Sequence, residues 1–265
     1  MAAKYSRLQG RFTRHGPDYR FGENLGFTEI KQEFGFLTIK IGRWVSKDEQ
    51  QLAANLFYDA FADLAYLLNV PSEVIGLRNS LNLAFGTGGQ KNVQAHYAPG
   101  ERTLALAKNA GGGALAHEWW HAFDHYIVNK LYPHSKAKFA SEQWLNQKTK
   151  AKHPLNQRLE HFFSSSILTQ DGKQANYYAH QAFALDKAQG RIYYSDPTEL
   201  MARAFESVLE SQTSLVNQFL VSGTMENGPA LVYPNNEHRV LISEACFVYF
   251  AALGDTLRQL SLYSK

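Results

Sequence analysis

Cysteine is nearly absent from this sequence of 265 residues, in which Cys246 is the only one. An intramolecular disulfide and a zinc site built from several cysteines are therefore both excluded. An excess of charge of either sign is also lacking. Positive and negative residues nearly balance, so the formal net charge is only +3, and charged residues make up 19% of the chain. With 45% hydrophobic residues the chain can bury a core, and wholesale disorder is excluded.

Long hydrophobic runs are missing as well, since no uninterrupted run approaches the roughly 18 residues that span a bilayer. Residues 1–20 contain neither an apolar segment nor an export-type cleavage pattern, so we expect no signal peptide. The sequence therefore predicts a cytoplasmic protein without a membrane partner, and it indicates no oligomeric state.

Two segments are basic, residues 1–20 and residues 130–158. Such segments are more often solvated surface than a nucleic-acid site. Nucleic acid is therefore retained only as an alternative partner to a peptide or protein substrate.

The pattern of apolar and polar residues predicts a mixed fold. Two alternating runs at residues 27–34 and 36–44, separated by Gly35, favour a β-hairpin. Ser46 followed by Glu49 forms a capping box and predicts a helix that continues to about residue 68. Short strands are expected near residues 82–85, 93–98 and 102–107, and the strand at 102–107 could pair with an extended peptide.

The C-terminal half has a helical pattern. Asp196 and Pro197 are typical of the cap and first turn of a helix over residues 196–211. Residues 238–260 predict a final, mostly buried helix.

The segment GGGALAHEWWHAFDHY, residues 111–126, concentrates the residues that carry chemistry. On a helix with about 100° between successive residues, His121 lies about 40° from His117, and Glu118 lies beside that face. Two imidazoles one turn apart can bind the same Zn²⁺. The adjacent glutamate is then placed to accept a proton from metal-bound water, as in H-E-x-x-H metallohydrolases. The alternative is a core helix whose histidines are satisfied by hydrogen bonds, and Trp119 and Trp120 are expected to pack against the sheet.

A catalytic zinc needs a third protein ligand and one open position. Six residues are candidates for the third ligand, namely Glu199, Glu206, Glu160, His161, His125 and His180. Glu199 is favoured because Ala202 and Ala204, on the same predicted helix, allow close approach to another helix. It could instead complete a capping box by bonding back to the main-chain N–H of Asp196.

Two long segments, AHYAPGERTLALAKNAGGGALAHEWWHAFDHY and YYSDPTELMARAFE, resemble a bacterial and phage group of H-E-x-x-H metallopeptidase-like domains. These are the large polyvalent protein-associated domains and the free-standing CLCA_X family, and the resemblance extends over most of the chain after residue 20. The spacing of H-E-x-x-H-A-x-D and E-x-x-A-x-A-F is also distantly similar to the catalytic domain of anthrax lethal factor.

The resemblance implies that His117, His121 and Glu199 bind zinc and that Glu118 is the general base. Lethal-factor-like sites also place a tyrosine just before the third ligand, where it donates to the oxyanion, and the residues that match this position loosely are Tyr193 and Tyr194.

Three further residues are expected around the ligands. Asp124 could accept a hydrogen bond from a zinc-bound imidazole or could be a carboxylate on the helix surface. The aspartate that gluzincins carry four residues after the ligand glutamate is replaced by Arg203. Arg203 could pair with Asp124 or with Glu206.

We therefore predict an α+β, zincin-like domain over residues 21–265, preceded by a basic and loose arm over residues 1–20. Residues 21–130 would form a small twisted sheet packed on the H-E-x-x-H helix, and residues 131–265 a helical part that supplies the third ligand. The predicted function is that of a zinc metallopeptidase with one Zn²⁺ per chain. The alternative is a zinc-stabilised interaction module without turnover, associated with nucleic acid or a phage-related complex.

Overall fold

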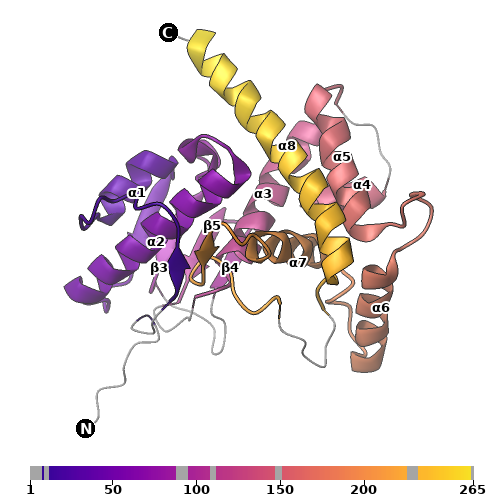
Figure 1. Ribbon diagram of the computed structural model, residues 1–265, viewed down its shortest axis with the longest axis horizontal. Coiled ribbons are helices and arrows are strands. Elements are labelled where there is room, and N and C mark those ends of the chain that lie inside the picture. The colour runs from indigo at the N-terminus through magenta and orange to yellow at the C-terminus, as the bar shows by residue number, and fades with distance from the viewer. Residues whose placement is uncertain are drawn as a thin grey trace. The chain divides into compact units, whose positions relative to one another are not determined.

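The computed structural model describes Leu8 and residues 12–87, 95–107, 112–146, 151–225 and 232–263 (Figure 1). Contacts divide the chain into two compact units. The first comprises Met1–Leu67, Pro71–Ala122 and Gln212–Ser222, and the second comprises Leu68–Val70, Phe123–Ser211 and Gly223–Lys265. The chain is a mixed α and β protein with a small sheet, as the sequence predicts.

A four-stranded sheet organises the first unit. Its strand order is β2 (Thr38–Ile41), β3 (Asn82–Phe85), β5 (Thr103–Leu106) and β4 (Ala95–Ala98). β2, β3 and β5 are parallel, and β4 is antiparallel to β5. The strand at residues 103–106 is therefore an inner strand, so the expectation that it pairs with a peptide is wrong, and β4 is the strand next to it at the end of the sheet.

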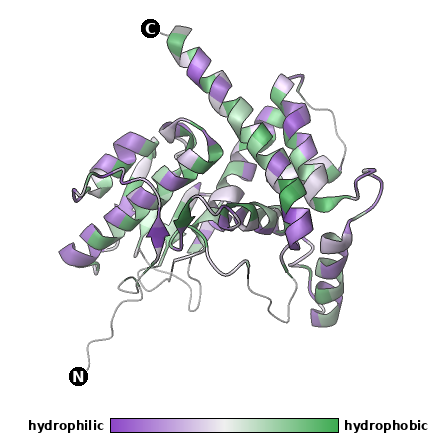
Figure 2. Cartoon of the chain, viewed as in Figure 1, coloured by the Kyte–Doolittle hydropathy of each residue, from purple (hydrophilic) through white to green (hydrophobic). Residues whose placement is uncertain are grey.

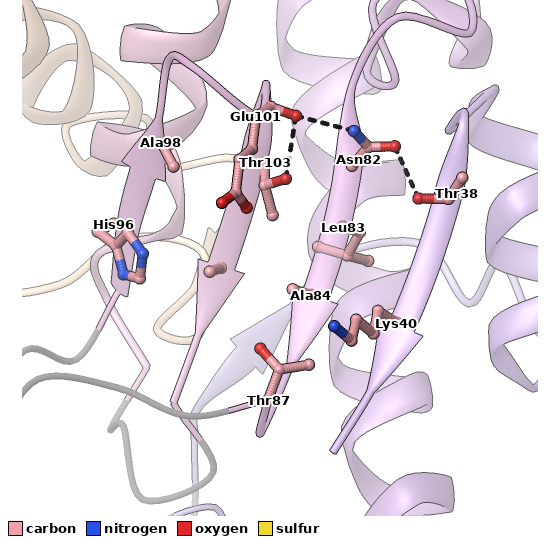
Figure 3. Close-up of a pocket in the computed structure, with 11 residues that line it drawn as sticks. Thr38, Lys40, Asn82, Leu83, Ala84, Thr87, His96, Ala98, Glu101 and Thr103 are labelled. Atoms are coloured by element: carbon pink, nitrogen blue, oxygen red, sulfur yellow. Dashed lines mark hydrogen bonds between the residues drawn. The ribbon is translucent and has the colours of Figure 1, made fainter.

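The two faces of this sheet differ in what covers them. Phe85 contacts the rings of Phe27 and Phe57, whose centroids lie 6.1 Å and 5.8 Å away, so this face is part of the aromatic core. The alternate side chains, including Lys40 and His96, line an open hollow of about 520 Å³ on the other face (Figure 3). None of the predicted site residues lines this hollow.

The segment before β2 is a helix rather than a strand. α1 covers Phe27–Phe34, where Ile30 and Phe34 are buried one turn apart on the same face. The main-chain N–H of Gly26 donates to Glu29 at 2.8 Å, and Gly35 ends the helix with a φ of 64°. The expected hairpin is therefore wrong, because the segment has a helical period and both end signals of a helix.

The following helix agrees with its sequence signals. α2 covers Lys47–Leu68. The main-chain N–H of Ser46 donates to Glu49 at 2.9 Å, and the N–H of Glu49 donates to the Ser46 hydroxyl at 3.3 Å. The capping box is confirmed.

The described part of the N-terminal arm is held in place. β1 (Arg14–His15) pairs with β6 (Val216–Asn217), and the Arg14 guanidinium binds the fully buried carboxylate of Asp63 at 2.7 Å. Burial raises the pKa of Asp63 although Arg14 and Asn217 both hydrogen-bond its charged form. Residues 12–20 are therefore not loose, and residues 1–7 and 9–11 lie outside the described part of the chain.

The second unit is helical, as expected. It contains α4 (Ala140–Leu145), α5 (Pro154–Ile167), α6 (Tyr177–Gln189), α7 (Pro197–Glu210) and α8 (Asn236–Tyr263). α5, α7 and α8 pack together, and the ring of Phe250 on α8 lies 6.0 Å from that of Phe205 on α7. α3 (Leu115–Leu131) has its residues up to Ala122 in the first unit and those from Phe123 in the second.

α8 is long and apolar enough to cross a membrane by length and composition, with a mean hydropathy of 1.5 in its best window. Only 33% of that window is buried, so the helix is less buried than expected. Figure 2 shows hydrophilic and hydrophobic residues side by side along it. The helix packs on α5 and α7, and its length and composition alone do not distinguish a membrane span from a core helix, which passes the same test.

Candidate metal centre

The start of α3 is held by main-chain contacts that only glycine permits. Gly113 has a φ of 104°, and a Cβ at this position would lie 2.2 Å from the Ser222 hydroxyl oxygen. The main-chain N–H of Gly113 donates to Phe219 at 2.9 Å, and that of Ala116 donates to Leu220 at 3.0 Å. Part of the preceding glycine-rich segment, residues 108–111, lies outside the described residues.

The two tryptophans of the motif support the helix from its apolar side. Trp119 and Trp120 are both fully buried. The indole N–H of Trp119 donates to the carbonyl of Ile75 at 2.8 Å. Both tryptophans are therefore buried, as a packing role requires, and the contact shown for Trp119 is with Ile75, which precedes β3, rather than with a strand of the sheet.

His117 and His121 point their rings at one another. Their Nε2 atoms are 3.1 Å apart, and their ring centroids are 4.8 Å apart. Two nitrogen ligands of a tetrahedral Zn²⁺, each about 2.0–2.1 Å from the ion, lie about 3.3 Å from each other. The two imidazoles therefore have the separation that one ion requires.

Glu118 lies beside this pair and is held by the sheet. Its Oε2 atom accepts a hydrogen bond of 2.7 Å from the main-chain N–H of Tyr97 on β4. A hydrogen bond to a carboxylate is stronger than one between neutral groups, so β4 orients this side chain. The sequence contains no signal for this contact, because the donor is a main-chain group.

Glu199 lies in the first turn of α7. The helix is capped by Asp196, whose carboxylate accepts from the main-chain N–H of Thr198 at 2.9 Å, and Pro197 follows as predicted. The Glu199 carboxylate accepts from the Arg203 guanidinium at 2.6 Å. The prediction that Asp196 caps this helix is confirmed, and Glu199 is engaged by Arg203.

His117, His121 and Glu199 form a group that could hold a metal ion, with the two histidines in the first unit and Glu199 in the second. They are the possible metal-binding group found among the described residues. The other sequence candidates for the third ligand are not in this group, namely Glu206, Glu160, His161, His125 and His180.

Arg203 is buried and surrounded by aromatic rings. Its guanidinium carbon lies 5.0 Å from the ring centroids of both Tyr193 and Tyr194. Burial alone would lower the pKa of Arg203, but the carboxylate of Glu199 and nearby tyrosines raise it above its ordinary value. Burial and then the charge of Glu199 raise the pKa of Tyr193. The rings of both candidate tyrosines therefore contact Arg203, the residue that binds Glu199.

The remaining predicted site residues are buried carboxylates. Asp124 is fully buried and accepts from both the main-chain N–H and the hydroxyl of Ser141, so the interpretation as a surface carboxylate is wrong. Glu206 is also buried and hydrogen-bonds Tyr233, whose pKa is raised first by burial and then by this carboxylate. The ion-pair partner that the structure shows for Arg203 is Glu199, rather than either of these two residues.

Sequence reasoning missed Asp186, at the C-terminal end of α6. Its buried carboxylate accepts hydrogen bonds from the main-chain N–H groups of Tyr193, Tyr194 and Ser195. Burial would raise the pKa of Asp186, but these donors and the Ser195 hydroxyl hold it at about 2. An aspartate followed by Gly190 at the end of a helix is the signal that could have found it.

The chain is similar to the family described as large polyvalent protein-associated domain 1 over residues 185–257. No curated protein and no solved structure matches the chain. Of the likeness expected from the sequence, the part to a large polyvalent protein-associated domain is found, over a segment that carries Asp186, Glu199 and Arg203 and does not include the H-E-x-x-H motif.

Proposed function

We propose that this chain is a zinc-dependent hydrolase of peptide bonds, with one Zn²⁺ held by His117, His121 and Glu199. The observation that carries the proposal is the separation of 3.1 Å between the Nε2 atoms of His117 and His121, and Glu199 completes the possible ligand group. Glu118 follows the first histidine directly, which is the arrangement of H-E-x-x-H hydrolases.

The donor set suits zinc. Two imidazole nitrogens and one carboxylate oxygen are the protein ligands of one common class of catalytic zinc site, which leaves a fourth position for water. The separation of 3.1 Å between the two Nε2 atoms is close to that of two zinc ligands. When bound, the ion would polarise a substrate carbonyl and lower the pKa of a bound water.

The residues of the chain then have separate tasks. His117, His121 and Glu199 bind the ion, and the Glu118 carboxylate accepts the proton of the attacking water. The main-chain N–H of Tyr97 donates to the Oε2 atom of Glu118 and thereby orients its carboxylate. Arg203 binds Glu199 and thereby fixes the orientation of its carboxylate.

The place of β4 in the first unit supports the same function. β4 lies at the end of the sheet and is antiparallel to its neighbour β5. Because Tyr97 on β4 contacts Glu118, a peptide that adds to this strand as a further strand would lie beside the general base.

The test is a Glu118→Gln variant assayed on a broad library of quenched peptides, together with its zinc content. We expect about one zinc per chain and turnover reduced by about 100-fold or more, because general-base catalysis contributes about 10²–10⁴-fold. His117→Ala should lose both zinc and turnover. His161→Ala, which changes an exposed histidine on α5, is the matched control and should lose neither. Undiminished hydrolysis by the Glu118→Gln protein would refute the role of Glu118.

A zinc-stabilised interaction module without turnover is the second candidate. It is favoured by the exposed cations of the basic segment, which include Lys136, Lys138 and Lys152. Lys148 and Lys150 of this segment lie outside the described residues. Zinc binding without hydrolysis of any peptide, together with salt-dependent binding of nucleic acid, would favour this module over the peptidase.

A further inference from the structure

The loop between α6 and α7, residues 190–196, is built around a single carboxylate. The Asp186 carboxylate accepts main-chain hydrogen bonds of 3.1 Å from Tyr193, 2.9 Å from Tyr194 and 2.8 Å from Ser195. It also accepts from the Ser195 hydroxyl at 2.6 Å. Three successive N–H groups that converge in this way form a small anion-binding concavity, which here is filled by a side chain of the same chain.

The main chain of the same aspartate contributes to this loop. The carbonyl of Asp186 accepts from the main-chain N–H of Gly190 and from that of Arg191, the latter at 3.2 Å. Asp186 therefore binds the loop at its beginning through the main chain and at its end through the side chain. Among the described residues, no other side chain accepts as many hydrogen bonds from this loop.

The loop leads directly to the proposed zinc ligand. Tyr193 and Tyr194 place their rings on the Arg203 guanidinium, and the carbonyl of Tyr194 accepts from this guanidinium at 3.3 Å. Arg203 in turn donates to Glu199. A continuous series of contacts thus runs from Asp186 through the two tyrosines and Arg203 to the carboxylate of Glu199, entirely within the second unit.

Because Asp186 is buried, this series of contacts depends on the Asp186 carboxylate from which it starts. Asp186 is 5% exposed and Ser195 is 8% exposed, so water cannot readily replace the acceptor. Removal of the carboxylate leaves three main-chain N–H groups without their acceptor, so the loop must rearrange to give them another one.

We propose that Asp186 is a positioning residue for zinc binding, which acts through Tyr193, Tyr194 and Arg203 on the orientation of Glu199. This inference rests on the proposed zinc site. It assigns a function to a residue that touches neither the ion nor the substrate.

The experiment compares the wild type with Asp186→Ala, Asp186→Asn and Ser195→Ala. The zinc Kd is measured by competition with a chelator, and amide hydrogen exchange is followed in peptides that cover residues 190–196. Asp171→Asn is the control, because Asp171 is an exposed carboxylate of the same unit that accepts from Thr169 and Lys173. Circular dichroism and the Tm show whether each variant is folded.

We expect Asp186→Ala and Asp186→Asn to lose the protection of the loop amides and to bind zinc about 10-fold to 100-fold more weakly, as when residues that support metal ligands are changed. Ser195→Ala removes a single donor and should have a smaller effect, and Asp171→Asn should have none. Formate, added to Asp186→Ala, can accept the same N–H groups and should restore both the protection and the zinc affinity.

Two results would overturn the inference in different ways. If the wild type binds zinc but its Kd is unchanged in the Asp186 variants despite a loosened loop, the aspartate has only a structural role. If the folded wild type binds no zinc, the proposed zinc site itself is wrong. Should Asp186→Ala fail to fold, Asp186→Asn and Ser195→Ala give the same comparison with a smaller perturbation.

Discussion

Replacement of Arg203 by methionine distinguishes a zinc ligand from a purely structural ion-pair partner at Glu199. The side chains of Arg203 and Glu199 are only 6% and 15% exposed, and they bind each other at 2.6 Å. Loss of the guanidinium leaves a carboxylate with little access to water. Breaking a buried pair costs about 3–5 kcal/mol, and because Glu199 retains some exposure we expect about 3 kcal/mol.

Zinc changes this cost if Glu199 is a ligand. Arg203 then orients a carboxylate that binds the ion, so Arg203→Met should bind zinc about 10-fold more weakly, and with saturating zinc the penalty should be larger by about 1.4 kcal/mol than without zinc. If Glu199 does not bind the ion, the penalty is the same with and without zinc.

The assay is urea unfolding of the wild type and of Arg203→Met, each with excess chelator and with saturating zinc. A difference of about 3 kcal/mol corresponds to a Tm shift of roughly 6–12 °C for a chain of this size. Arg258→Met is the control, because its pair with Asp255 is exposed and should contribute less than about 1 kcal/mol. An equal penalty in both conditions would refute the assignment of Glu199 as a ligand.

Two further predictions concern stability. Gly113→Ala should destabilise the protein by about 2 kcal/mol in urea unfolding, because φ is 104° and the new Cβ would meet the Ser222 hydroxyl. Gly100→Ala, where nothing lies within 4 Å, should be nearly neutral, and equal effects of the two changes would contradict the role of Gly113. The pKa of Asp186 is held at about 2, below the value of about 3.9 in an unfolded chain. Its ionised form therefore stabilises the fold by roughly 2–3 kcal/mol above pH 4, and this is lost as the pH falls from 4 towards 2. Asp186→Asn should lower stability at pH 7 and flatten the acid dependence of unfolding, whereas an unchanged dependence below pH 4 would contradict the low pKa.

Local sequence signals determined the helix ends and the helix face that carry the candidate site. The capping box at Ser46 and Glu49 and the cap at Asp196 each depend on residues within one helical turn, so the sequence predicts them correctly. The face that His117 and His121 share follows from the period of the helix alone, and their Nε2 atoms indeed lie 3.1 Å apart. Glu199 was favoured among six candidate ligands by the small residues Ala202 and Ala204 on its helix and then by the resemblance, and it is part of the possible metal-binding group.

Tertiary structure decided the features that depend on distant segments. The order of the strands makes residues 103–106 an inner strand, which a pattern of alternating residues cannot reveal. The partner of Arg203, the burial of Asp124 and the hydrogen bond from Tyr97 to Glu118 depend on which side chains or main-chain groups meet after folding. The sequence by itself therefore determined which residues can carry the chemistry, because helical spacing is local. Their orientation was decided only by the fold, because the groups that hold them are main-chain donors and buried charges, which leave no periodic trace in the sequence.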